Sequence, residues 1–167
     1  RQHLIREGHA EAREEAEKAL LVNPNSLSAL TALAGVHLAE GDLADFRDVR
    51  SRALSINPHY AALDATLADL SVKTRRYVQA VARAEAAVQL DSASWEAWGL
   101  LGLNELRLGQ IEKGRADLER AFAGDPYNPW FKNNLDLLDT FDRFETVRTD
   151  HFELFLHGTE ADLLATY

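Results

Sequence analysis

Hydrophobic residues recur along this chain with the spacing of amphipathic helices, and short polar turns separate the segments. The segment Ser26 to Glu40 (SLSALTALAGVHLAE) has this spacing and ends before Gly41. A second such segment runs from Leu43 to Ile56. Pro58 follows it and ends the unit, because proline lacks the N–H group that a continuing helix needs. The pattern therefore predicts a pair of antiparallel helices.

The same pattern returns along the chain with a period of 34 residues. Four columns of equivalent residues show the period most clearly. They are Ala19, Ala53, Ala87 and Ala121; Leu20, Leu54, Val88 and Phe122; Pro24, Pro58, Ser92 and Pro126; and Leu33, Leu67, Leu101 and Leu135. An Asn or Asp precedes each member of the third column. We interpret the chain as an array of helix pairs.

Small residues mark where the two helices of a pair are expected to approach each other. Gly102 lies inside a helical segment, where glycine costs about 1 kcal/mol relative to alanine. The equivalent residues are Ala34 and Ala68 on the first helices, facing Ala12, Ala80 and Gly114 on the second helices. We therefore assign Gly102 to close contact between helices. Phe46 stands in the second column, so we expect a wider crossing in its unit.

The repeats resemble the tetratricopeptide repeat, whose pattern is W-x2-L-G-x2-Y followed by Ala, Phe, Ala and Pro. The unit with Trp98, Leu101 and Gly102 matches best, and Gly109, Ala121 and Pro126 also fit. Glu105 replaces the usual Tyr of this unit and Gly114 the usual Ala. The preceding unit departs further, with Asp64, Arg75 and Ser92 in place of Trp, Gly and Pro. The resemblance implies an all-α fold, a right-handed superhelix of helix-turn-helix repeats with a continuous core.

Five parts follow from this register. A half repeat covers residues 1–24, full repeats cover 25–58, 59–92 and 93–126, and a capping helix covers 129–143. Asp136 and Asp139 stand where small and aromatic residues are usual, which makes this last helix more polar outside. Since the chain starts on a half repeat and contains no Met, we expect more repeats upstream.

Residues 144–167 lose the helical period. Phe152, Leu154 and Leu156 fall on one face of a strand, and His151, Glu153, Phe155 and His157 fall on the other. Thr149-Asp150 is typical of a turn, so the segment predicts a β-hairpin. Thr159 to Asp162 resembles a capping box that opens a further helix. A lone two-stranded ribbon is marginally stable in water. We therefore expect these residues to begin another domain that continues past Tyr167.

A second resemblance covers residues 125–167. The segments Asp125 to Asn128, Asn134 to Asp139, Phe144 to Thr146, His151-Phe152 and Leu164 to Tyr167 are similar to the junction in bacterial proteins between tetratricopeptide repeats and a gluzincin-type zinc metallopeptidase domain. The His-Glu-x-x-His zinc motif that this resemblance implies is absent from the chain. It would lie beyond Tyr167.

Composition narrows the possible chemistry. The net charge of −9 argues against nucleic-acid binding, which needs a basic face, and the absence of Cys excludes disulfides and thiolate metal sites. His3, His9, His37 and His59 are scattered over three units, and His151 and His157 are about 20 Å apart along a strand. Acid pairs such as Glu14-Glu15 are typical of a solvated helix face. We predict no catalytic residues, no metal site, no cofactor and no membrane span.

The tetratricopeptide resemblance implies one functional surface, a concave groove lined by the first helix of each unit. Chaperone-tail receptors of this family clamp a terminal carboxylate there with Lys and Asn, and this groove has neither Lys nor Arg, which argues against such tails as partners. Leu103 and Leu106 are alternatively explained by packing between helices, and Trp95 either anchors a partner or caps the stack. The predicted groove residues are Thr31, Gly35, Leu38, Ala65, Asp69, Val72, Gly99, Leu103, Leu106, Asn133 and Leu137.

Two functions fit these observations. In the first, the chain is a non-catalytic protein-interaction scaffold whose groove binds a partly apolar, extended peptide or a neighbouring domain. In the second, it is the arm of a larger zinc metallopeptidase, presenting substrate or positioning a catalytic domain that follows Tyr167. Neither function gives this chain catalytic activity of its own.

Overall fold

The computed structural model describes residues 2–148 and 150–164, with side chains omitted for 2–7, 162 and 163. Eight α-helices come first, followed by a 3-10 turn, a hairpin and a short helix. They are α1 (Gln2–Val22), α2 (Leu27–Glu40), α3 (Leu43–Ile56), α4 (Ala61–Lys73), α5 (Tyr77–Leu90), α6 (Trp95–Arg107), α7 (Ile111–Gly124), α8 (Pro129–Asp139), η1 (Phe141–Arg143), β1 (Phe144–Arg148), β2 (Glu153–His157) and α9 (Gly158–Leu164). The predicted helix Leu43 to Ile56 is confirmed to the residue.

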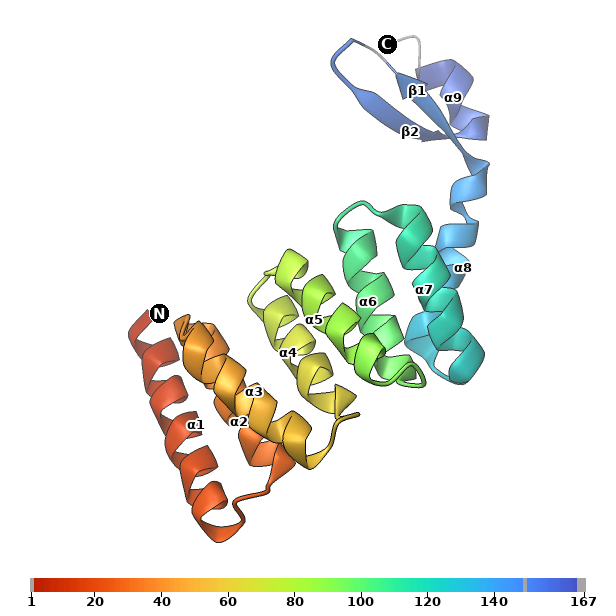
Figure 1. The fold of residues 1–167 in the computed structure, drawn as a ribbon. Helices are drawn as coiled ribbons and strands as arrows, with labels where there is room; N and C mark the ends of the chain where they lie inside the picture. Colours follow the sequence, from red (N-terminus) through yellow and green to blue (C-terminus); the bar gives the residue numbers. More distant parts are fainter. Residues whose placement is uncertain (1, 149, 165–167) are drawn as a thin grey trace.

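The helices stack in sequence order as antiparallel pairs, which gives an elongated array with α1 at one end and α8 at the other (Figure 1). Within pairs, α2 packs on α3, α4 on α5 and α6 on α7. Between pairs, α1 packs on α2, α5 on α6 and α7 on α8, and the first helices α2, α4 and α6 also touch in series. The backbones of α3 and α4 approach each other less closely, and the buried side chains of Phe46 on α3 and of Leu63 and Leu67 on α4 pack between them.

The turns inside the pairs share one backbone conformation. Gly41 and Gly109 have φ angles of 87° and 77°, in the left-handed region that glycine adopts without a steric penalty. Arg75 occupies the equivalent position with φ of 59°. This residue replaces the glycine of the repeat pattern and still makes the same turn, in a conformation that is uncommon for side chains with a Cβ atom.

The connections between pairs explain the column of Asn and Asp residues. The side-chain Oδ1 atoms of Asn23, Asn57 and Asp91 each accept a hydrogen bond from the backbone N–H two residues later, at 3.0, 3.0 and 2.9 Å. Such Asx turns fold the chain back after α1, α3 and α5. The next helix can therefore start within a few residues.

Small residues bring α6 and α7 into backbone contact. A Cβ atom placed on Gly102 would lie 2.6 Å from the carbonyl oxygen of Gly114, and one on Gly114 would lie 2.7 Å from that of Gly102. The predicted role of Gly102 is confirmed. α2 and α3, where Phe46 occupies the second column, make less extensive contact than α4 with α5 or α6 with α7, in agreement with the wider crossing that we expected.

Buried Ala and Leu side chains form a core that runs the length of the array. Leu30, Leu63, Leu67 and Leu118 are fully buried, together with Ala53, Ala87 and Ala121 of the alanine column, whereas Ala19 on α1 is exposed. Across the part of the chain that the structure describes, no helix combines the length and apolar character needed to cross a membrane.

The predicted hairpin is confirmed beyond the last helix of the array (Figure 1). β1 and β2 are antiparallel, with Phe144 opposite His157 and Arg148 opposite Glu153. Of the predicted turn, Thr149 lies outside the described residues. The predicted capping box is wrong, because α9 already begins at Gly158 and the Thr159 hydroxyl lies 2.8 Å from Nδ1 of His157. The side chain of Asp162 lies outside the described part.

Candidate functional site

The predicted groove residues differ in exposure along the array. Four are buried, namely Thr31, Gly35, Ala65 and Gly99. Five are half-buried, namely Leu38, Asp69, Val72, Leu103 and Leu106. Asn133 and Leu137, both on α8, are exposed. A partner can therefore reach the C-terminal end of this surface most easily.

The next first helix explains why the earlier positions are covered. A Cβ atom on Gly99 would lie 2.1 Å from the ring of Phe131 on α8, so the Phe131 ring packs directly on the backbone of this glycine. A Cβ atom on Gly35 would lie 3.4 Å from Leu70 on α4. Leu103 and Leu106 pack against the cluster of Leu118, Ala121, Phe131 and Leu138. Gly35, Gly99, Leu103 and Leu106 thus take part in packing between helices. For Leu103 and Leu106, this was the alternative explanation given by the sequence.

On α8 the corresponding face carries large exposed apolar side chains. Trp130 is 72% exposed, Leu137 is 55% exposed and Phe141, just after the helix, is 45% exposed. Their spacing of seven and then four residues places them on one side of the helix. Asn134 lies between them and donates a hydrogen bond to the carbonyl of Trp130 at 2.8 Å. We call Trp130, Asn133, Leu137 and Phe141 the α8 face.

The sequence reading found only half of the α8 face. It named Asn133 and Leu137 from the repeat register but missed Trp130 and Phe141. The signal was available, because Trp130 and Leu137 are seven residues apart within a predicted helix.

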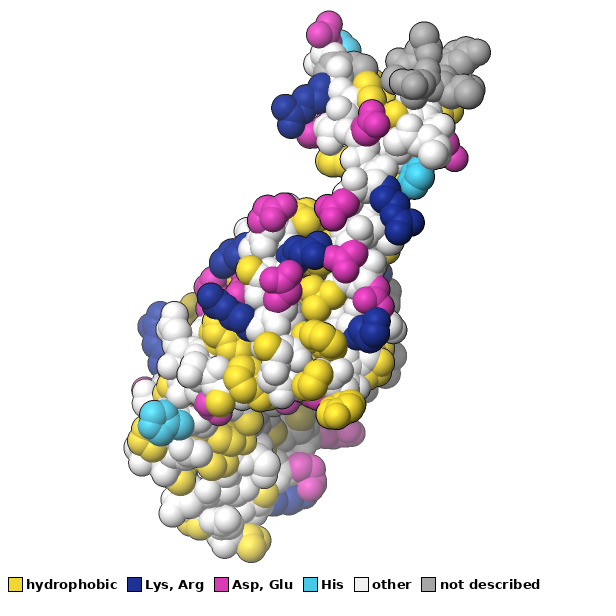
Figure 2. Space-filling model, turned by 90° about the vertical axis from the view of Figure 1, so that its right-hand side faces the viewer, with side chains coloured by type: hydrophobic (Ala, Val, Ile, Leu, Met, Phe, Trp, Pro, Cys, Tyr) yellow, Lys and Arg dark blue, Asp and Glu magenta, His cyan; other side chains and the backbone are white. Residues whose placement is uncertain are grey.

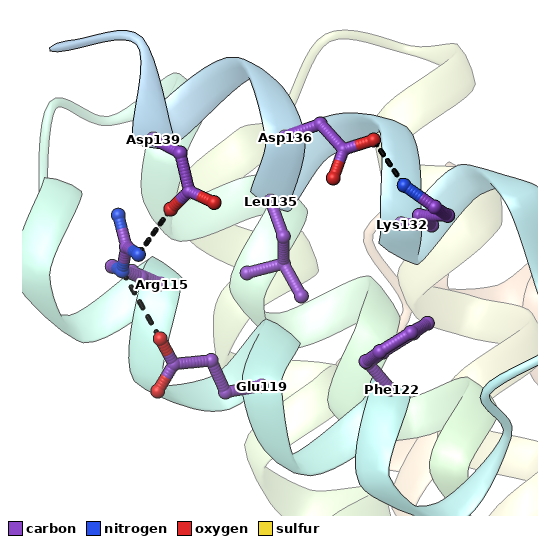
Figure 3. Close-up of a pocket in the computed structure, with 7 residues that line it drawn as sticks. All are labelled: Arg115, Glu119, Phe122, Lys132, Leu135, Asp136 and Asp139. Atoms are coloured by element: carbon purple, nitrogen blue, oxygen red, sulfur yellow. Dashed lines mark hydrogen bonds and ion pairs between the residues drawn. The ribbon is translucent and has the colours of Figure 1, made fainter.

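A pocket of about 340 Å³ lies on the other side of α8, against α7. The side chains of Phe122 and Leu135 lie between two sets of ion pairs (Figure 3). Arg115 donates to Glu119 at 3.0 Å and to Asp139, and Lys132 donates to Asp136. Figure 2 shows hydrophobic side chains gathered on this end of the array, below a band where basic and acidic side chains alternate. Asp136 and Asp139 thus lie in ion pairs on this side of α8, whereas the opposite side carries the apolar α8 face.

Two acidic side chains of the described residues, Asp64 and Glu105, are fully buried inside the array. Asp64 has no exposed surface and accepts hydrogen bonds from Nε of Arg50 at 2.9 Å and from Arg83 at 3.3 Å. The Arg83 guanidinium also lies 4.6 Å from the centre of the Phe46 ring. Asp64 therefore joins α3, α4 and α5. The acid that replaces Trp in the repeat pattern has a structural role.

Glu105 is the second buried acid, and it replaces the Tyr of the repeat pattern. Its Oε1 atom lies 2.6 Å from Nζ of Lys113. Burial raises the pKa of Glu105, and the nearby Asp117 raises it further, while Lys113 acts in the opposite direction. The hydrogen bond to Glu105 in turn raises the pKa of Lys113. The pair links α6 to α7 within the packed array, away from the predicted groove residues.

The remaining candidates have ordinary structural roles. The indole ring of Trp95 packs on Gly124 at the end of α7, where a Cβ atom would lie 1.9 Å from the ring. Glu14 and Glu15 both pair with Lys18 on a solvated face, at 2.7 and 3.1 Å.

Residues 5–61 and 66–129 match the tetratricopeptide repeat family, and the chain therefore belongs to this family. The tetratricopeptide repeat is a non-catalytic protein-interaction fold, which agrees with the expectation that this chain is not an enzyme. The match ends at residue 129, and the comparisons give no support to the resemblance of residues 125–167 to a peptidase junction. No curated protein matches the chain.

Solved structures share the fold. MamA is 17% identical with a TM-score of 0.56, covering 82% of this chain and 80% of MamA. The first tetratricopeptide domain of Spaghetti (RPAP3), bound to the HSP90 peptide SRMEEVD, is 18% identical with a TM-score of 0.53, covering 68% of this chain and 90% of that domain. The Arabidopsis OM64 domain is 16% identical with a TM-score of 0.53, covering 68% of this chain and 94% of that domain. At these identities the similarity concerns the fold alone.

Proposed function

We propose that the chain is a non-catalytic scaffold that binds an extended, partly apolar peptide along its first helices, with the α8 face as the main contact. One observation carries this proposal. Leu137 is exposed on α8, whereas Gly35, at an equivalent position of an earlier unit, is buried under the following first helix. The α8 face thus presents apolar surface of the kind that repeat units normally bury, and an apolar partner would bury it.

The chemistry of the α8 face suggests the chemistry of the partner. Trp130, Leu137 and Phe141 offer apolar surface, and the exposed amide of Asn133 can hydrogen-bond to the backbone of an extended peptide. Lys and Arg are absent from the predicted groove positions, so recognition of a terminal carboxylate by a cationic clamp is not expected. In this respect we expect the chain to differ from the RPAP3 domain bound to SRMEEVD.

A peptide-library selection followed by affinity measurement tests the proposal. Peptides selected on the whole chain should contain apolar residues, and Leu137→Asp should weaken their binding at least tenfold because it places a charge in the contact. Val78→Asp is the matched control, since Val78 on α5 is 71% exposed and lies away from α8. Equal binding by the two variants would refute the role of the α8 face.

The peptide SRMEEVD provides a second arm of the experiment. We expect no saturable binding of this peptide, because the predicted groove lacks Lys and Arg. Saturable binding that requires the terminal carboxylate would contradict this expectation.

Two finer alternatives stay predictions. One is that a downstream domain of the same polypeptide, in place of a separate peptide, occupies the predicted groove. The other is that the chain is the arm of a zinc metallopeptidase, which predicts a His-Glu-x-x-His motif after Tyr167 and bound zinc in the longer product.

A further inference from the structure

A buried histidine faces three acidic side chains at the turn between α2 and α3. Nδ1 of His37 lies 4.0 Å from Oδ2 of Asp42 and 3.9 Å from Oδ2 of Asp45. His37, Glu40 and Asp42 each place a possible ligand atom within 4.8 Å of those of the other two. This cluster lies apart from the α8 face, at the other end of the array.

The backbone of the turn fixes the position of these residues. The carbonyl of His37 accepts hydrogen bonds from the N–H groups of Gly41 and Asp42, at 3.0 and 2.9 Å. Gly41 permits this arrangement through its φ of 87°. Asp42 precedes α3 at the cap position, yet its side chain accepts no capping hydrogen bond. Its carboxylate is therefore available to a ligand beside His37.

The imidazole of His37 is the second, independent sign of a ligand. The residue is 6% exposed, and its Nδ1 atom is buried without a hydrogen-bond partner among the described residues. Leaving a buried polar atom unpaired is unfavourable, so most such atoms have a partner. The distances from Nδ1 to Asp42 and Asp45 are too long for direct hydrogen bonds, and they leave room for an ion between the groups.

We propose that His37, Glu40 and Asp42 bind one divalent transition-metal ion, with Zn²⁺ the best fit, and that Asp45 is available as a fourth ligand. Zn²⁺ lies about 2.0–2.2 Å from nitrogen and carboxylate donors, so two donors on one ion are at most about 4.4 Å apart. Rotation of the exposed carboxylates of Glu40 and Asp42 closes the remaining difference. Arg13 holds Oε2 of Glu40, which leaves Oε1 for the ion.

The donor set favours Zn²⁺ over Mg²⁺ and Ca²⁺. An imidazole nitrogen with carboxylates suits Zn²⁺ and its neighbours among the transition metals, whereas Mg²⁺ and Ca²⁺ prefer oxygen donors alone. A bound ion would join the end of α2 to the start of α3. It would thus add a local constraint to a helix pair whose packing is less extensive than in the next two pairs.

Isothermal titration of the whole chain with Zn²⁺, and separately with Mg²⁺, tests the proposal. We expect one Zn²⁺ per chain with a dissociation constant in the micromolar range or below, and no heat of specific binding with Mg²⁺. Asp42→Asn should weaken Zn²⁺ binding at least tenfold. This side chain is 56% exposed and forms no capping bond, so the variant should fold.

Two control variants make the test specific. Asp48→Asn changes another exposed acid of α3, and His59→Gln removes an exposed histidine elsewhere; both should keep the affinity of the unchanged protein. His37→Gln should abolish the visible absorption that Co²⁺ gives when bound through nitrogen. No Zn²⁺ binding, or binding that Asp42→Asn leaves unchanged, would overturn the proposal, and His37 would then serve as an ion-pair partner of Asp42 and Asp45.

Discussion

Gly102 and Gly114 show how a single atom sets the distance between two helices. Each glycine faces the backbone carbonyl of the other, at a separation that leaves no space for a side chain. Both residues give up helix propensity, since glycine is less favourable than alanine inside a helix by about 1 kcal/mol. Close packing of α6 on α7 offsets this cost, and it gives the most extensive contact between two helices in the described array.

Replacing Gly102 with Ala should therefore destabilise the protein. The new Cβ atom would lie 2.6 Å from the carbonyl oxygen of Gly114, so the helices must separate. We expect a loss of about 1–3 kcal/mol in the free energy of unfolding, typical of overpacking. This corresponds to a melting temperature lower by about 2–4 °C per kcal/mol, measured by circular dichroism.

Gly8→Ala is the matched control for Gly102→Ala. Gly8 also lies inside a helix, α1, but apart from its chain neighbours and the backbone of its own helix no atom of the described residues lies within 4 Å of a Cβ built on it. This variant should be unchanged or more stable by up to about 1 kcal/mol, since alanine favours the helix. If both variants melted at the temperature of the unchanged protein, the packing role of Gly102 would be wrong.

The two glycines of α6, Gly99 and Gly102, show which structural roles can be predicted from the sequence and which cannot. The role of Gly102 followed from the sequence, because its column in the three full repeats holds only small residues, namely Ala34, Ala68 and Gly102. Gly99 was placed in the groove by the same register, although Phe131 covers it. The register tells which side of a helix a residue lies on, but the side chain that covers this position comes from the following unit. Its size and rotamer depend on packing.

At the scale of elements, α3 and α4 have the least close backbone approach between consecutive helices of the described array. An ion-pair network spans this position. Asp64 on α4 is fully buried and accepts hydrogen bonds from Arg50 on α3 and Arg83 on α5. We infer that this network joins α3 to α4 together with the buried side chains of Phe46, Leu63 and Leu67.

Asp64→Ala should consequently loosen this joint. Loss of a buried carboxylate that accepts charged hydrogen bonds costs about 1.5–3 kcal/mol. Breaking a buried ion pair can cost more, but the side chains of Arg50 and Arg83 are 27% and 26% exposed, so water can solvate them partly. Urea denaturation followed by fluorescence measures the loss.

Asp69→Ala provides the comparison on the same helix. Asp69 is half-exposed and pairs with Lys73 one turn later, at 2.6 Å. Exposed pairs of this type contribute about 0.3–0.5 kcal/mol, so this variant should remain close to the unchanged protein. Equal losses in the two variants would show that burial of Asp64 adds nothing to stability.

Elements whose signals are local were predictable from the sequence, and contacts between elements were not. The bounds of α3 follow from the Gly41-Asp42 turn before it and Pro58 after it. The hairpin followed from alternation in Phe152, Leu154 and Leu156. The cluster around His37 escaped notice, because Glu40 and Asp42 approach the imidazole only through the left-handed turn at Gly41. The helix after the hairpin was expected, but its start was misplaced because His157 interacts with Thr159.

At the scale of the whole molecule, each central helix of the array has a neighbouring helix on both sides, whereas each end helix has a neighbour on one side only. Each unit of a repeat protein contacts only the adjacent units, so stability is the sum of local terms and of interfaces with neighbours. α5 and α6 each pack extensively on the helix before and on the helix after. Among the described elements, α1 packs extensively on α2 alone.

Hydrogen exchange of the backbone amides should follow this arrangement. We expect the slowest exchange in α5 and α6, which have two interfaces, and faster exchange in α1 and in the hairpin, which can open without breaking the core of the array. α3 should exchange faster than α5, although both are second helices of 14 residues, because the backbone of α3 lies less close to the helix that follows it. Mass spectrometry of peptic fragments resolves these helices. Uniform protection from α1 to α8 would mean that the array opens in one cooperative step, and the wider backbone spacing of α3 and α4 would then have no energetic consequence.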